Sequence, residues 1–194
     1  SFSEGYCVVD VATSGDSDEL SGYIDRSGEI VIPDEFTIAN DFSGGLARVQ
    51  RDRNGPFGFI GYDGSPRFAL EFDDAAAQFS EGVAYFRKGE EHMILDRDGT
   101  RIGGIDIPSF DGHIGSFSEG LADVAVSERS GLFRRRVSDR CGFVRPNGEV
   151  AIPLKFDWVF PFEHGLARVR EGKTVGYIDH DGDYVWSTRD WEGY

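Results

Sequence analysis

Residues 117–124 read Phe117-Ser118-Glu119-Gly120-Leu121-Ala122-Asp123-Val124, and closely similar stretches occur four more times in the 194-residue chain. The other stretches begin at Phe2, Phe42, Phe79 and Phe162, so the anchoring phenylalanines lie 40, 37, 38 and 45 residues apart. A nearly fixed period of this length is typical of a repeat protein, in which each unit completes its core by packing on its neighbours. The sequence therefore predicts a single β-repeat domain over residues 1–194, with copies at about 2–41, 42–78, 79–116, 117–161 and 162–194.

A second block follows each anchor at a matching distance. In the first copy it reads Gly22-Tyr23-Ile24-Asp25-Arg26-Ser27-Gly28, and in the last it reads Gly176-Tyr177-Ile178-Asp179-His180-Asp181-Gly182. Polar residues that end in glycine between two apolar stretches are typical of a β-hairpin, because the glycine supplies a positive φ. The strand after the hairpin ends in Ile-Pro in two copies, and we expect Pro33 and Pro153 to end those strands.

These patterns predict an all-β protein. No stretch shows the sustained 3.6-residue apolar spacing of a helix, and each copy of about 38 residues has room for three short strands. Nine of the 16 phenylalanines fall in two repeat columns, which predicts that they fill a core shared by the stacked copies.

The array can close on itself. The fifth copy ends on a hairpin, and Phe2–Val11 would supply its third strand if the first and last copies meet. Closure would remove exposed sheet edges, as in β-propellers. We favour a closed, propeller-like ring, and an open β-solenoid or a two-layer β-roll is the alternative.

The composite pattern resembles the bacterial WG (or KWG) repeat. It reads Gly-aromatic-Ile-Asp-x-x-Gly-x-x-Val-Ile-Pro, then Phe, then Phe-Ser-x-Gly-Leu-Ala-x-Val, and it covers nearly the whole chain in five copies. The resemblance implies a β-rich repeat domain that binds other macromolecules, and it brings no catalytic residues. The tryptophan that names the family is absent from all copies, where its place is taken by Ser21, Phe57, His92, Cys141 and Val175.

The charge of the chain restricts its partners. The sequence holds 35 Asp and Glu against 20 Lys and Arg, for a formal net charge of −15. A nucleic-acid binder needs a basic face to displace counterions from phosphates, so this composition argues against that class. No apolar run approaches the roughly 18 residues of a membrane-spanning helix. We therefore expect a soluble protein with no nucleic-acid partner and no membrane span; the oligomeric state and the compartment are open.

One stretch departs from the acidic composition. Residues 127–140 lengthen the link between two predicted strands of the fourth copy, and loops longer than the repeat minimum are often on the binding face. Arginine and aromatic residues dominate interface hot spots, and arginine binds carboxylates and phosphates through paired hydrogen bonds. The candidate partner contacts are Arg129, Leu132, Phe133, Arg134, Arg135, Arg136 and Arg140. The alternative is that these arginines pair with the protein's own carboxylates.

Other chemistry has weaker sequence support. Asp179, Asp181 and Asp183 alternate around a glycine, as in calcium-binding loops, although their spacing does not fit an EF-hand. The alternative is a solvated hairpin tip. No spacing typical of a zinc site, a nucleotide-binding loop or a nucleophile elbow occurs, so we expect no cofactor and no catalytic residues.

The sequence therefore favours a non-enzymatic protein-binding module with a basic protein partner, because opposite charges steer association. One specific form is an inhibitor or immunity-type protein that masks its partner. The alternatives are a carbohydrate-active enzyme or glycan-binding domain that uses surface carboxylates, and a structural segment of a larger repeat protein.

Overall fold

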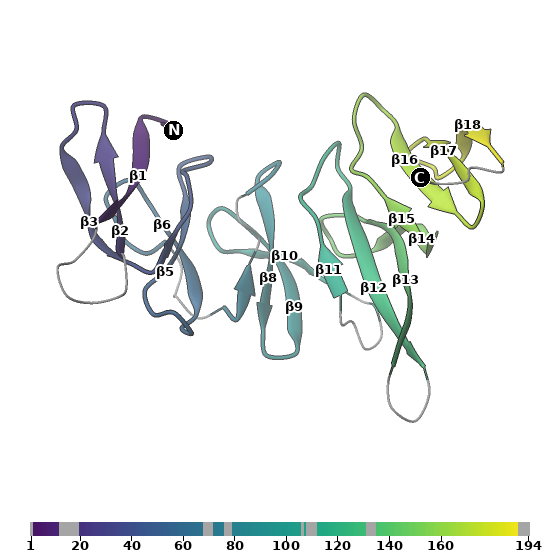
Figure 1. The fold of residues 1–194 in the computed structure, drawn as a ribbon, viewed down its shortest axis with the longest axis horizontal. Helices are drawn as coiled ribbons and strands as arrows, with labels where there is room; N and C mark the ends of the chain where they lie inside the picture. Colours follow the sequence, from purple (N-terminus) through teal and green to yellow (C-terminus); the bar gives the residue numbers. More distant parts are fainter. Residues whose placement is uncertain are drawn as a thin grey trace. The chain divides into compact units, whose positions relative to one another are not determined.

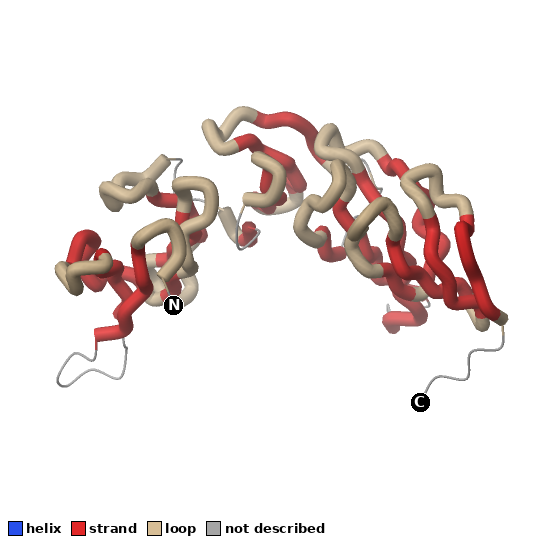
Figure 2. Tube along the Cα trace, turned by 90° about the horizontal axis from the view of Figure 1, so that it is seen from above, coloured by secondary structure: helices blue, strands red, loops and turns tan. Residues whose placement is uncertain are grey.

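The computed structural model describes residues 2–11, 20–67, 72–75, 79–105, 107, 112–130 and 135–189; for residues 11, 75, 113, 127–130 and 135–139 it describes the backbone. The regular elements of this part are β-strands joined by loops (Figure 2), which confirms the predicted all-β class. No helix among the described residues is long and apolar enough to cross a membrane. The chain divides into two compact units, Ser1–Arg101 and Ile102–Tyr194.

Among the described residues, ten strands, β1 to β10, occupy the first part of the chain (Figure 1). They form sheets with the strand orders β1-β2-β3, β4-β5-β6 and β10-β9-β8-β7. Their bounds are β1 Tyr6–Val11, β2 Leu20–Asp25, β3 Ile30–Phe36, β4 Ile38–Ala39, β5 Ala47–Gln50, β6 Phe57–Ile60, β7 Asp74–Ala75, β8 Val83–Lys88, β9 Glu91–Asp96 and β10 Arg101–Gly104.

Eight strands, β11 to β18, follow in two four-stranded antiparallel sheets. The sheet orders are β11-β12-β13-β14 and β15-β16-β17-β18. The bounds are β11 Gly112–Ile114, β12 Ala122–Ser130, β13 Arg135–Val144, β14 Val150–Phe156, β15 Trp158–Val159, β16 Ala167–Glu171, β17 Thr174–Ile178 and β18 Tyr184–Thr188.

Each sheet is centred on one predicted copy. In the first, third, fourth and fifth copies the three predicted strands lie in one sheet, as β12, β13 and β14 do in the fourth; the third predicted strand of the second copy, residues 68–70, lies outside the described residues. Four sheets also contain a short strand from the link that ends the preceding copy: β4, β7, β11 and β15 each pair with the first strand of the next copy. Consecutive copies are therefore joined by backbone hydrogen bonds.

The Phe-Ser-Glu-Gly stretch forms a two-residue hairpin turn. Ser3 and Tyr6 exchange both backbone hydrogen bonds, at 2.8 and 2.9 Å. Between them Glu4 has φ 51° and Gly5 has φ 95°. Positive φ at both central residues matches the type I′ turn, whose twist suits the adjoining strands. The same pair of values recurs at Glu81, Glu119 and His164 and the glycines that follow them.

In the second, fourth and fifth copies, the alternation of side chains along the first strand explains which of its residues are buried. In the Leu-Ala-x-Val block the alanine and the valine point to one face and are fully buried, as at Ala167 and Val169, whereas Arg168 between them is exposed. The two phenylalanine columns are core residues at seven positions, Phe36, Phe42, Phe72, Phe79, Phe117, Phe156 and Phe162. Phe110 lies outside the described residues. Phe2 is exposed, so the core assignment is wrong for this residue.

The expected strand ends at the prolines are also wrong. Strands β3 and β14 continue past Pro33 and Pro153, and a register shift takes up the extra residues. Tyr23 pairs with Ile32 but Ser21 pairs with Phe36, so three residues of β3 lie opposite one residue of β2. Proline is tolerated in such a bulge because no ladder hydrogen bond is required of it.

The pairing of the first strand corrects the predicted closure. Strand β1 pairs with β2 from Tyr6↔Asp25 to Val11↔Leu20, and the fifth copy's sheet consists of β15 to β18. Residues 2–11 are thus the first strand of their own copy and not the missing strand of the fifth. No pairing among the described strands closes the array.

Glu4 links the first copy to the second. Its Oε1 accepts a hydrogen bond from Gly44 N at 2.7 Å, and its Oε2 accepts from Gly45 N at 3.0 Å and from the Tyr62 hydroxyl at 2.8 Å. The hydrogen bond from Gly45 is the main cause that holds the pKa of Glu4 below its usual value, and those from Tyr62 and Gly44 add to it. The carboxylate form therefore stabilises the contact between these copies.

The fourth and fifth copies repeat this link. Glu119 Oε2 accepts from Gly165 N at 2.9 Å and lies 3.3 Å from His180 Nε2. The Ser118 hydroxyl donates to the carbonyl oxygen of Phe162 at 2.7 Å. The Ser-Glu pair of the repeat motif thus serves as a polar clamp on the turn of the next copy.

We expect Glu4→Gln to lower stability by at most about 1 kcal/mol at pH 7, because solvent screens this exposed group. A carboxyl whose pKa is lowered by folding stabilises the native state above its unfolded pKa, and that contribution is lost as pH falls through the folded pKa. The difference between wild type and variant should therefore shrink below about pH 4. Urea unfolding from pH 7 to pH 3 measures it, with the exposed Glu90→Gln as control. A constant difference over this range would show that the charge of Glu4 is not involved.

Candidate interaction surface

The hairpin of β12 and β13 extends beyond the rest of its sheet. Strand β11 pairs with residues 124–126 of β12, and β14 pairs with residues 141–144 of β13. From Ser127↔Asp139 to Ser130↔Arg135 the two strands pair with each other beyond both neighbours. Figure 1 shows this two-stranded extension, which we call the β12–β13 arm (residues 127–130 and 135–139).

The arm carries the arginine-rich stretch. Residues 127–130 and 135–140 are strands and not the predicted loop, because the hairpin pairing continues through them with one register shift after Glu128. The register places Arg129 opposite Arg136. Leu132, Phe133 and Arg134 lie outside the described residues. As partner contacts, all of these remain predictions.

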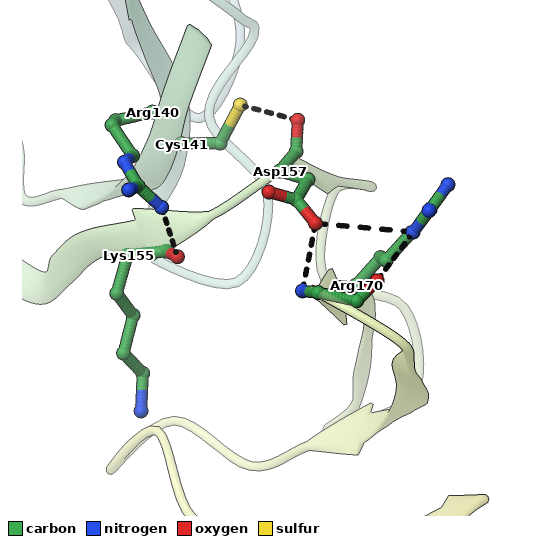
Figure 3. Close-up of polar contacts among 6 residues, drawn as sticks. Arg140, Cys141, Lys155, Asp157 and Arg170 are labelled. Atoms are coloured by element: carbon green, nitrogen blue, oxygen red, sulfur yellow. Dashed lines mark hydrogen bonds and ion pairs between the residues drawn. The ribbon is translucent and has the colours of Figure 1, made fainter. Parts of the chain in front are cut away.

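Arg140 lies at the root of the arm, and its side chain is engaged within the protein. Its Nη1 donates to the carbonyl oxygen of Lys155 on β14 at 3.3 Å (Figure 3). The neighbouring Cys141 Sγ contacts the carbonyl oxygen of Asp157 at 3.7 Å. These contacts fix the end of β14 against β13, so Arg140 supports the arm's attachment to the sheet.

Asp157 connects this root to the fifth copy. Its Oδ2 accepts from Gly172 N at 2.7 Å and lies 3.8 Å from Arg170 Nε, which also donates to the Gly172 carbonyl oxygen at 2.9 Å (Figure 3). The carboxylate thereby stabilises the turn between β16 and β17. Asp73 occupies the corresponding place in the second copy, where it accepts from Gly89 N at 2.5 Å.

The Asp179 carboxylate is held by its own hairpin turn. Its Oδ1 accepts from the backbone N–H of Asp181 at 3.1 Å and of Asp183 at 3.0 Å. Asp25 and Asp96 make the same kind of bonds at their own tips. Within the described ranges no group of three or more His, Cys, Asp or Glu side chains is arranged to hold a metal ion. The calcium assignment stays a prediction.

Sequence reasoning missed the exposed aromatic residues of the fifth copy. Tyr177 and Trp186 lie opposite each other on β17 and β18, with ring centroids 6.3 Å apart, and both are exposed. On the same sheet the Arg168 guanidinium lies 5.4 Å from the centre of the Trp158 ring. Tyr177 occupies the same position in its repeat as Tyr23, which is buried, so the repeat pattern did not indicate that Tyr177 is exposed.

Comparisons with solved structures return distant likenesses. The chain is similar to streptogramin B lyase, at 15% sequence identity and a TM-score of 0.40, over 96% of this chain and 75% of that one. It is also similar to a protein of unknown function from Bacteroides caccae, at 16% identity and a TM-score of 0.30, over 89% and 76% of the two chains. No curated protein sequence matches the chain.

The family comparison gives a direct result. The model of the WG containing repeat matches three segments, residues 22–54, 57–91 and 142–174. Each match begins close to the second strand of a copy, at β2, β6 and β13, and ends after the first strand of the next copy. Together the three segments cover more than half of the 194 residues. This protein therefore belongs to the family of proteins with the WG containing repeat.

Proposed function

We propose that this chain is a non-enzymatic protein-interaction module that binds a basic protein and uses the β12–β13 arm as a contact element. The observation that carries the proposal is the arm itself, a two-stranded extension rich in arginine on a chain with a net charge of −15. An inhibitor or immunity-type protein that masks its partner is one form of this function.

The register of the arm supports a binding role. Like charges at directly opposed positions destabilise an antiparallel pair, and Arg129 lies opposite Arg136. This cost favours a partner that supplies carboxylates or phosphates to the arm. The arm also extends beyond β11 and β14, so its described pairs are not enclosed by the sheet.

The distribution of charge supports a basic partner. Residues 1–101 hold 20 of the 35 acidic residues and 9 of the 20 basic ones, whereas residues 102–194 hold 15 and 11. A negative potential of this kind attracts a basic protein and speeds its association at low salt. The acidic surface then steers the partner, and the arm provides contacts to its acidic groups.

The test is capture of partners from a lysate of the source organism at low and moderate salt, with identification of the bound proteins. We expect wild-type protein to retain a protein of high isoelectric point at low salt and to lose it as salt rises, because screening weakens the attraction. Replacing Arg134, Arg135 and Arg136 by glutamate should reduce the retained amount at least tenfold.

The control variant has the same change in net charge as the arm variant. The variant Arg26→Glu, Lys173→Glu and Arg189→Glu reverses three exposed cations outside the arm. We expect it to bind the basic partner as well as wild type does. Equal retention by the two triple variants would show that the arm is not the contact element. Retention of acidic proteins alone would overturn the proposed partner class.

A further inference from the structure

Consecutive copies pack through one aromatic contact that recurs along the chain. The aromatic residue of the second strand in one copy lies against the anchoring phenylalanine of the next. The ring centroids are 5.0 Å apart for Tyr23 and Phe42, 5.1 Å for Phe59 and Phe79, and 4.8 Å for Phe143 and Phe162. All six rings are buried.

A second contact lies beside the aromatic one. An isoleucine on the third strand of a copy packs against the tip glycine of the next copy's hairpin. A Cβ added at Gly64 would lie 3.3 Å from Ile32, and one added at Gly182 would lie 3.1 Å from Ile152. Ile32 and Ile152 are 2% and 0% exposed. The first and fourth copies therefore each offer an aromatic residue and an isoleucine, and the copy that follows covers them with a phenylalanine and a glycine.

The fifth copy offers this surface uncovered. Tyr177 stands at the position of Tyr23 and Phe143, and Trp186 stands at the position of Ile32 and Ile152. Tyr177 is 41% exposed and Trp186 is 55% exposed, whereas their counterparts are 0–2% exposed. We call Tyr177 and Trp186 the tail face.

The first copy carries the complementary surface, also uncovered. Phe2 is 49% exposed, whereas the other four anchoring phenylalanines are 0–3% exposed. A Cβ added at Gly28, the tip glycine of this copy, would meet no described atom within 4 Å. We call Phe2 and Gly28 the head face.

We propose that the head face of one molecule docks on the tail face of a second copy of the same chain. Phe2 then lies against Tyr177 and Gly28 against Trp186, which continues the interface already built between consecutive copies. The contact joins two different surfaces, so it leads to rings or to chains of molecules.

This contact is weaker than the internal ones. Two of the internal contacts include a polar clamp, which is formed by Ser3 and Glu4 in the first copy and by Ser118 and Glu119 in the fourth. The fifth copy has Glu163 and His164 at these two positions, so the polar part of the clamp is missing. Association should therefore be reversible and dependent on concentration.

The experiment uses two variants, each with one blocked face. The head-blocked variant is Phe2→Asp, and the tail-blocked variant is Tyr177→Ser with Trp186→Ser. Sedimentation equilibrium should give wild type an average mass that rises above 21.5 kDa with concentration, whereas each variant alone stays at that mass. An equimolar mixture of the two should form dimers of twice that mass and nothing larger, because each molecule keeps one intact face.

The control for the tail face is Val185→Ser. Val185 is exposed on the same strand as Trp186 but lies at the bulge between the pairs Tyr177↔Trp186 and Ile178↔Tyr184, where it has no counterpart in the internal contacts, so this variant should associate like wild type. The arm variant with three reversed arginines should also associate like wild type, which keeps this inference separate from the proposed function. The proposal is overturned if wild type stays at the monomer mass at all concentrations, which is the result that closure within one molecule would give. A mixture without dimers overturns it as well.

Discussion

Replacing Phe162 by alanine is expected to lower the free energy of unfolding of the 102–194 unit by about 3–5 kcal/mol. The ring is fully buried, and it lies 4.8 Å from the ring of Phe143 and 4.3 Å from that of His180. It also belongs to a core cluster with Ile152 and Ile178. The alanine would remove the contact between two copies and leave a cavity that their strands cannot close without shifting.

The measurement is chemical unfolding followed by tryptophan fluorescence. All three tryptophans of the sequence are in residues 102–194, so the signal reports on this unit. The control is Phe160→Ala, two residues away, which removes an exposed ring of the same size and should cost less than about 1 kcal/mol. If the two variants lost equal stability, the core role assigned to the anchoring phenylalanines would be wrong.

The repeat and its hairpins were predictable because they depend on local chemistry. The tip glycines have positive φ in all five copies, as at Gly28 and Gly182, and the alternating Leu-Ala-x-Val block forms a strand in the second, fourth and fifth copies, which carry it. The short strands β4, β7, β11 and β15 were not predicted. They contain two or three residues, which is too few to show a period, and pairing with the next copy determines them.

The contacts between copies were also hidden from sequence reasoning. The recurring glutamate is visible in the sequence, but its hydrogen-bond donors are not. Gly44 and Gly45 donate to it through backbone N–H groups, which do not distinguish these residues from others. The same limit applies to the exposed rings. Tyr177 and Tyr23 occupy identical motifs, but Tyr23 packs against Phe42 of the next copy and is buried, whereas Tyr177 is exposed.

The candidate site was predictable in position but not in form. A cluster of five arginines in an acidic chain is evident from the sequence, whereas the placement of four of them, Arg129, Arg135, Arg136 and Arg140, on paired strands is not. The stretch is mostly polar and contains glutamate, glycine and aspartate, which are depleted in strands, so its sequence resembles a loop. The pairing of β12 and β13 extends into it from the body of the sheet, and the strand form follows from that continuity.

Replacing Gly142 by alanine is the second change for which we expect a large effect. A Cβ at this position of β13 would lie 2.5 Å from the carbonyl oxygen of Ile152 and 2.9 Å from the backbone of Pro153. The bulge of β14 brings its backbone this close to β13, so a side chain forces the two strands apart. We expect the free energy of unfolding to fall by a net value of about 1–3 kcal/mol. This net value already includes the small stabilisation that alanine gives by reducing the conformational entropy of the unfolded chain.

The fifth copy supplies a matched comparison, because Gly176 faces a similar clash with the carbonyl oxygen of Trp186 on β18. Strand β14 is held from its other side, since Ile152 packs against Gly182 of the next copy, whereas Trp186 is exposed and β18 is free to move outward. Gly176→Ala should therefore cost less than Gly142→Ala in the same fluorescence-monitored unfolding. Equal losses of stability would mean that the effect of each substitution depends on the close approach of two strands within one sheet and not on the copy that follows. A smaller loss at Gly176 would show that each copy is made rigid by the copy that follows it.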